Sequence, residues 1–269
     1  MPRTLVGGVE LYYELDGDGP RLLFISGTGG DLRQRPRVTD GHLGATFEVL
    51  TYDQRGLGQS SIPPGPYSTA DYADDAAALL DHVGWDDALV LGVSFGGMVA
   101  QELALRHPSV VRRLVLACTS SGGAGGASYP LHELTDLPAD ESIVRHLEVA
   151  DTRFDKAWRE ANPARWDQLV KMFAARAEVG REEPRRAEGH ALQLDARRRH
   201  DTWDRLEQIR CPTFVCTGRY DGIAPPENSE RLASAIPGAR LELFDGGHLF
   251  LLQDSTAFPT IIDFLLKSP

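Results

Sequence analysis

The chain has 269 residues and a formal net charge of −11 at neutral pH, with 42% hydrophobic and 25% charged residues. These proportions are typical of a globular protein that buries a sizeable core. The excess of negative charge argues against nucleic acid or an anionic membrane surface as a partner. No apolar stretch approaches the roughly 18 residues that cross a bilayer, so the sequence predicts no membrane span.

Cysteine usage and the first residues indicate a reducing compartment. The three cysteines, Cys118, Cys211 and Cys216, are an odd number, and two of them end apolar runs. Buried thiols are therefore expected in place of a disulfide framework. The first eight residues lack the apolar core of a secretion signal, and no Cys/His spacing indicates a zinc site. We expect a cytoplasmic protein.

Short apolar runs alternate with helix-like stretches along most of the chain. Most runs are continuous, as in strands that are buried on both faces of a parallel sheet. The expected strands are 9–15, 22–25, 47–52, 88–91, 114–118, 213–216 and 241–244, and the expected helices are 69–83, 97–106, 227–235 and 258–266. This order predicts an α/β protein with an open, mostly parallel, doubly wound sheet.

The segment 120–205 interrupts the alternation of strands and helices. It contains no strand candidate, and its clearest patterns are amphipathic helices over 166–179 and 186–199. A stretch with helical periodicity alone cannot continue the sheet. We interpret it as a helical cap inserted into a core that consists of residues 1–119 and 206–269.

The most informative motif is Gly92-Val93-Ser94-Phe95-Gly96, which follows the strand 88–91 and leads into a helix. In this setting Gly-x-Ser-x-Gly has the form of a nucleophile elbow, a strained strand-to-helix turn that exposes the serine hydroxyl. The flanking glycines have no Cβ, so the strand and the helix can approach closely. Ser94 is the candidate nucleophile, and the alternative is a turn of small residues that holds a serine by chance.

A serine hydroxyl needs a base to take its proton and a carboxylate to orient that base. Of the eight histidines, His248 follows the last expected strand through a glycine-rich turn, at the edge of the sheet where Ser94 lies. The other histidines are expected to be solvated. Asp221, after strand 213–216, is the candidate carboxylate, and Asp245, on the loop of His248, is its competitor. The chain order Ser, Asp, His is that of one fold in particular.

Two backbone N–H groups are expected to bind the oxyanion that forms in the transition state. Phe95 supplies one because it directly follows the candidate nucleophile. The second should come from the glycine-rich loop after strand 22–25, because glycine lets backbone amides approach a ligand. We assign it to Thr28, with Gly27 as the alternative; the loop could also be only a tight turn.

Together these residues resemble the α/β-hydrolase superfamily over nearly the full length of the chain apart from the cap. The motif at 52–60, Tyr-Asp-Gln-Arg-Gly-Leu-Gly-Gln-Ser, looks like the loop after the fourth strand in that family, where its role is structural. The resemblance implies an α/β-hydrolase fold: an eight-stranded, mostly parallel, doubly wound sheet with an antiparallel N-terminal part and an inserted helical cap.

Within the superfamily, the segments 27–32, 64–68 and 236–239 look like those of 3-oxoadipate enol-lactonases. The same layout is similar to that of cofactor-independent haloperoxidases, or perhydrolases, and of small carboxylesterases. One position departs from the pattern, because Ser26 stands where many members carry a histidine before the oxyanion glycine. This departure weakens an assignment to the C–C bond hydrolases.

The residues and the resemblance predict a serine hydrolase that cleaves a carboxylic ester or lactone through an acyl-enzyme. Its partner is a small-molecule substrate, and the chemistry requires no metal or organic cofactor. Four alternatives stay open: an enol-lactonase of aromatic catabolism, a cofactor-free perhydrolase or haloperoxidase, a C–C bond hydrolase, and a non-catalytic small-molecule receptor. Neither the substrate nor the oligomeric state follows from the sequence.

Two groups of residues in the cap invite a functional interpretation. The run 197–200, Arg-Arg-Arg-His, would suit a substrate carboxylate, but consecutive charges wind around a helix, so a solvated face is the favoured interpretation. Trp158, Trp166 and Phe173 are expected in the core of the cap and not at the substrate.

Overall fold

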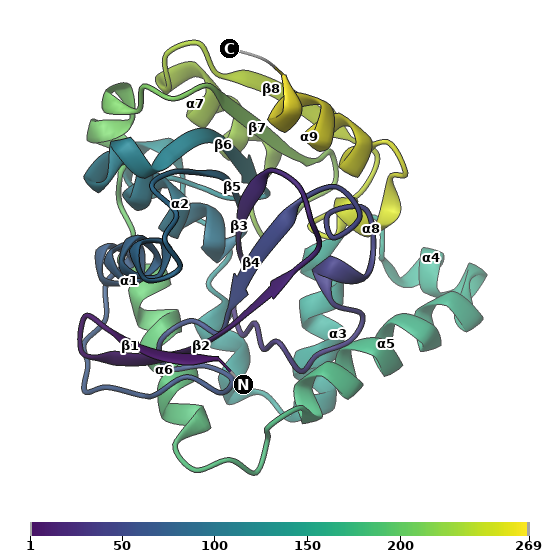
Figure 1. The fold of residues 1–269 in the computed structure, drawn as a ribbon. Helices are drawn as coiled ribbons and strands as arrows, with labels where there is room; N and C mark the ends of the chain where they lie inside the picture. The colour runs from purple at the N-terminus through teal and green to yellow at the C-terminus, as the bar shows by residue number, and fades with distance from the viewer. Residues whose placement is uncertain (1, 268–269) are drawn as a thin grey trace.

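A computed structural model describes residues 2–267 and has an eight-stranded sheet at its centre (Figure 1). The strands are β1 (Arg3–Val6), β2 (Val9–Asp16), β3 (Arg21–Ile25), β4 (Glu48–Tyr52), β5 (Ala88–Val93), β6 (Val111–Ala117), β7 (Thr213–Gly218) and β8 (Arg240–Phe244). Their order is β1-β2-β4-β3-β5-β6-β7-β8, and β2 pairs antiparallel with both of its neighbours while all other pairs are parallel. The predicted mostly parallel sheet is confirmed.

Helices cover both faces of the sheet. The helices α1 (Thr69–His82), α2 (Phe95–Arg106) and α7 (Pro226–Ala235) pack on one face, and α8 (Phe250–Gln253) and α9 (Ala257–Leu266) pack on the other (Figure 1). In β5, Ala88 and Val90 belong to the first core, whereas Leu89 and Leu91 belong to the second. Because successive side chains of a strand point to opposite faces, a central strand needs a continuous apolar run.

The segment between β6 and β7 is helical and contributes no strand to the described chain. Its helices are α3 (Ala139–Ala150), α4 (Lys156–Ala161), α5 (Pro163–Glu178) and α6 (Arg186–Arg198). Trp158, Trp166 and Phe173 pack against a small hydrophobic cluster inside this segment, as expected from the sequence. Among residues 2–267, no helix is long and apolar enough to span a bilayer.

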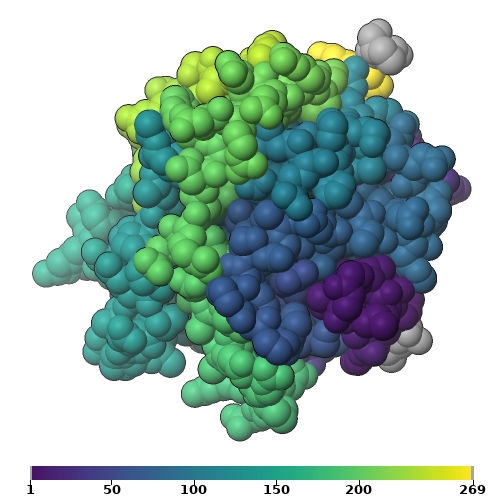
Figure 2. Space-filling model, turned by 90° about the vertical axis from the view of Figure 1, so that its left-hand side faces the viewer, coloured from purple at the N-terminus to yellow at the C-terminus, as the bar shows by residue number. Residues whose placement is uncertain are grey.

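At Gly189 the backbone of helix α6 lies against the backbone of the core with no side chain between them. A Cβ on Gly189 would meet the carbonyl oxygen of Gly56, in the loop after β4, at 1.9 Å. Near the end of α6, Arg199 donates to the carbonyl oxygen of Tyr67 at 2.8 Å. Figure 2 shows the green part of the chain around residue 200 lying against the blue part around residues 50–75. These contacts fix the position of α6 relative to the core.

A Gly189→Ala substitution should destabilise the protein. The added methyl group must displace a backbone carbonyl, which costs about 3 kcal/mol, whereas alanine in a helix gains only about 1 kcal/mol over glycine. We expect a net loss of about 2 kcal/mol in the free energy of unfolding, measured by chemical denaturation. The control is Gly41→Ala, because a Cβ on Gly41 meets nothing within 4 Å. Equal stability of the Gly189→Ala protein and the wild type would contradict the close contact.

Candidate active site

Ser94 lies in the turn between β5 and α2 with φ 56° and ψ −116°. Residues other than glycine rarely adopt this conformation, which persists only where the surroundings enforce it. Here the N–H of Ser94 donates to the carbonyl oxygen of Ala117 at 2.8 Å, and the Thr119 hydroxyl donates to the carbonyl oxygen of Ser94 at 2.7 Å. The end of β6 therefore holds the strained turn from both sides of the residue.

The two flanking glycines allow the close approach that the motif predicts. A Cβ on Gly96 would lie 2.0 Å from the carbonyl oxygen of Ile25, and a Cβ on Gly92 would lie 2.4 Å from that of Gly96. Any side chain at either position would push α2 away from β3 and β5. The turn has the geometry of a nucleophile elbow.

His248 and Asp221 complete a hydrogen-bonded row that starts at Ser94. The Nε2 atom of His248 is 2.9 Å from Oγ of Ser94, and its Nδ1 atom is 2.8 Å from Oδ2 of Asp221. The three residues follow β5, β7 and β8, whose carboxyl ends meet at one edge of the sheet. The structure thus brings together the three residues that the sequence analysis singles out.

The carboxylate of Asp221 is fixed by the backbone of its own loop. Its Oδ1 atom accepts hydrogen bonds from the N–H groups of Ile223 and Ala224, both at 2.8 Å. Asp245, the alternative partner, has a side chain that is 74% exposed and pairs with Arg153. It therefore cannot orient the ring of His248.

Phe95 and the loop that carries Thr28 lie beside Ser94. A Cβ on Gly27 would be 4.0 Å from Oγ of Ser94, which places the loop after β3 next to the hydroxyl. Phe95 is the first residue of α2, so its N–H lies at the positive end of the helix. In the described part of the chain, the N–H groups of Phe95 and Thr28 donate to no protein acceptor. Both can therefore serve a bound oxygen atom.

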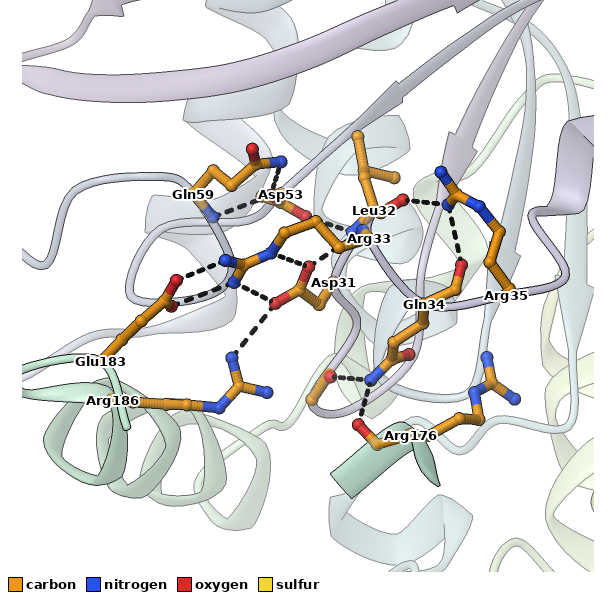
Figure 3. Close-up of polar contacts among 11 residues, drawn as sticks. Asp31, Leu32, Arg33, Gln34, Arg35, Asp53, Gln59, Arg176, Glu183 and Arg186 are labelled. Atoms are coloured by element: carbon orange, nitrogen blue, oxygen red, sulfur yellow. Dashed lines mark hydrogen bonds and ion pairs between the residues drawn. The ribbon is translucent and has the colours of Figure 1, made fainter. Parts of the chain in front are cut away.

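The buried carboxylate of Asp53 binds the backbone of the loop after β3. Asp53 is 1% exposed and accepts hydrogen bonds from the N–H of Leu32 at 2.7 Å and the N–H of Gln59 at 2.8 Å (Figure 3). Burial raises the pKa of Asp53 to about 6, although these hydrogen bonds oppose the shift. The structural role that the resemblance implies for this motif is consistent with these contacts.

Ion pairs tie the same loop to the start of α6. The buried carboxylate of Asp31 contacts Arg33 at 2.7 Å and Arg186 at 3.1 Å, and Arg33 also binds Glu183 (Figure 3). Burial alone would raise the pKa of Asp31, but the hydrogen bonds from Arg33 and Arg186 hold it below its usual value. The loop that carries Thr28 is therefore linked to the helical segment.

The expectation of solvated histidines is wrong for part of the helical segment. His200 is 5% exposed, and burial lowers its pKa to about 3. Burial also lowers the pKa of His190 and brings that of His146 to about 4. His200, which follows α6, lies beside Thr69 of α1, with Nδ1 and Oγ1 3.0 Å apart, and the ring of His146 on α3 packs against Phe173 on α5. The sequence pattern alone does not reveal these contacts.

The expectation of a solvated basic face at 197–200 needs the same correction. Arg198 and Arg199 lie at the surface, where both pair with Asp195. Arg197, in contrast, is only 6% exposed. Consecutive residues point in different directions around a helix, and in this run Arg197 and His200 are the buried members.

Among residues 2–267, one group of side chains at the same edge of the sheet could hold a metal ion. Cys118, Asp221 and His248 each have one potential ligand atom, and these atoms lie within 4.8 Å of one another. Burial raises the pKa of the Cys118 thiol well above its usual value, so the sulfur is a protonated thiol and a poor ligand. The atoms of Asp221 and His248 already bind each other, which favours proton transfer at this site over metal binding.

The chain is similar to known hydrolases in sequence and in structure. The model of the α/β hydrolase fold family matches residues 20–255. RutD of Azorhizobium caulinodans, a proposed carbamate hydrolase, is 31% identical over 255 residues, which are 93% of this chain and 92% of that protein. The 3-oxoadipate enol-lactonase 2 of Acinetobacter baylyi is 26% identical over 262 residues, covering 96% of this chain and 94% of that protein. Among solved structures, the enol-lactonase from Burkholderia xenovorans LB400 superposes with a TM-score of 0.79 at 26% identity, covering 99% of this chain and 100% of that one.

The raised pKa of Asp53 predicts a specific pH dependence of stability. Between about pH 4 and pH 6 the folded protein binds a proton here that the unfolded chain releases, so this residue's contribution to stability falls as pH rises. From pH 4 to pH 7 the free energy of unfolding of Asp53→Asn should therefore rise relative to the wild type by on the order of 3 kcal/mol. Urea denaturation across this pH range measures the difference. Parallel pH profiles of the two proteins would show that the carboxylate is not shifted.

Proposed function

The chain belongs to the α/β hydrolase fold family, and we propose that it is a serine hydrolase that cleaves a carboxylic ester or lactone of a small molecule. One observation carries the proposal: Ser94 Oγ, the ring of His248 and the carboxylate of Asp221 form a continuous row with distances of 2.9 and 2.8 Å. This row supplies a nucleophile, a base and an orienting anion in the order that acyl transfer requires. A non-catalytic receptor would have no need of all three.

In the proposed mechanism, Oγ of Ser94 attacks the carbonyl carbon while Nε2 of His248 takes the hydroxyl proton. Asp221 holds the ring in the tautomer that leaves Nε2 free and stabilises the imidazolium. The N–H groups of Phe95 and Thr28 bind the oxyanion. The alcohol leaves with the proton from His248. A water molecule, deprotonated by the same nitrogen, then attacks the acyl-enzyme, and His248 returns the proton to Oγ of Ser94 as the carboxylic acid is released.

We also propose that residues 120–205 act as a cap over this site. Two contacts support this role. The N–H of His248 donates to the carbonyl oxygen of Ala150, at the end of α3, at 2.6 Å. The N–H of Gly29, in the loop of Thr28, donates to Gln193 on α6 at 2.9 Å. Both loops of the site are thereby attached to the helical segment, which then forms the wall facing the substrate.

The choice of an ester or lactone draws on the similar proteins. Two of them are named as enol-lactonases, and a third is a proposed carbamate hydrolase. All three names describe attack on a carbonyl carbon that bears a leaving group. A 4-nitrophenyl ester is therefore a suitable first substrate, because its good leaving group makes acylation easy to detect.

Ser94→Ala should lower kcat/KM for such an ester by at least about 10³-fold, because the members of a triad act as a unit. The matched control is Ser120→Ala, which removes a buried hydroxyl that contacts Ser128 and not the triad. It should retain nearly full activity. Release of 4-nitrophenolate measures both. Turnover by the Ser94→Ala protein close to that of the wild type would refute the proposed nucleophile.

A further inference from the structure

Arg197 is a buried cation with a free hydrogen-bonding edge. Its Nη1 atom donates to the carbonyl oxygen of Tyr129 at 2.7 Å. Its Nε and Nη2 atoms are buried and have no partner in the described chain. Buried donors normally have acceptors, because leaving them unpaired costs free energy. The side chain is therefore positioned for an acceptor that residues 2–267 do not supply.

The free edge of Arg197 has the geometry that binds a carboxylate. Elsewhere in this chain, Arg55 uses the same two nitrogens, Nε and Nη2, to hold both oxygens of Asp75 at 2.6 and 2.7 Å. Arg106 binds Asp74 in the same way at 3.0 and 2.6 Å. Such bidentate pairs are the strongest and most directional contacts of a guanidinium group. A carboxylate is therefore the matching partner for Arg197.

Gln193, on the same helix as Arg197, contacts the loop of the candidate oxyanion site. Its Oε1 atom accepts the hydrogen bond from Gly29, which directly follows Thr28, and its own Nε2 is a buried donor without a partner. Residues four apart lie on the same face of a helix. Arg197 lies four residues after Gln193 on α6, about 6 Å along the helix axis. This separation is comparable to the length of a short alkyl chain.

The charge of Arg197 also acts on residues of the triad and beside it. Its charge interacts with the carboxylate of Asp221. The charges of Arg197 and His248 both lower the pKa of His146. Burial lowers the pKa of Arg197 to about 10 and that of His146 to about 4. At neutral pH the arginine is therefore charged while His146 is neutral. This inward-facing cation lies in a protein whose net charge is strongly negative.

We propose that Arg197, assisted by Gln193, is a carboxylate-binding subsite of the candidate active site. The substrate is then an ester or lactone that carries a free carboxylate a short chain away from the carbonyl that Ser94 attacks. This inference rests on the proposed function, since it assigns the second anchor point of that substrate. If Arg197 only balanced the charge of Asp221, replacing it would change kcat/KM for every substrate alike.

A pair of matched esters separates these roles. Mono-4-nitrophenyl glutarate carries the carboxylate, and 4-nitrophenyl 5-methylhexanoate has an isopropyl group in its place. Arg197→Gln should lower kcat/KM for the glutarate ester by about 10–100-fold, mainly through KM, because a hydrogen-bonded charge is lost. For the neutral ester we expect a change below about 3-fold, and Arg197→Lys should give an intermediate loss for the glutarate ester. An equal fall for both esters would overturn the subsite.

The control variant is Arg198→Gln, which removes an exposed neighbour on the same helix that pairs with Asp195. It should leave the ratio of kcat/KM for the two esters unchanged. A ratio that falls as much as in Arg197→Gln would mean that general surface charge attracts the anionic ester, and would also overturn the proposal.

Binding to an inactive protein tests the subsite without turnover. Calorimetry with the Ser94→Ala protein should show that glutarate binds at least about 10-fold more tightly than neutral glutaramide, and that adding Arg197→Gln or Arg197→Lys weakens glutarate binding. If the wild type hydrolyses neither ester, the proposed function fails, but this binding experiment still decides the subsite. Equal affinity for glutarate and glutaramide would contradict it.

Discussion

The strained backbone at Ser94 exists because β3, β5 and α2 approach one another with no side chains between them. Gly92 and Gly96 supply the space, since a Cβ on either would overlap a backbone carbonyl. A non-glycine residue in such a conformation costs about 1–3 kcal/mol, which the hydrogen bonds to Ala117 and Thr119 help to offset. The hydroxyl therefore leaves the sheet edge at a fixed angle, toward the ring of His248 on the loop after β8. His248 and Asp221 continue the row of hydrogen bonds that begins at this hydroxyl.

The loops at the same edge of the sheet are also bound to the helical segment between β6 and β7. His248 is attached to the end of α3 through its backbone, and the loop of Thr28 is attached to α6 through Gln193 and the ion pairs of Asp31. Preorganised donors stabilise developing charge without having to reorganise during the reaction. In this arrangement the helix that holds the oxyanion loop also presents Arg197, so the reacting carbonyl and a distant anionic group of the substrate would be positioned by one rigid element.

Sequence reasoning was sufficient where function depends on topology. Ser94, Asp221 and His248 could be located because the carboxyl ends of parallel strands meet at one edge, whatever the details of packing. It failed where the burial of a side chain depends on which way a helix faces. Arg197 precedes two surface arginines in the sequence, and it is turned inward by the way α6 packs on the core, including the close contact between Gly189 and the backbone of Gly56. The strand β1 was missed for a related reason, since four residues with two inward side chains are too few to establish a period.

The nucleophilic role of Ser94 is the central claim, and covalent labelling tests it most directly. An alkyl fluorophosphonate reacts with a serine whose hydroxyl is activated by an adjacent base, and the phosphoryl oxygen of the reagent can occupy an oxyanion site. Mass spectrometry of the digested protein should find one phosphonyl group per chain, on the peptide that contains Ser94, and labelling should disappear in the His248→Ala protein. An unlabelled Ser94, or an adduct on a different residue, would contradict the account.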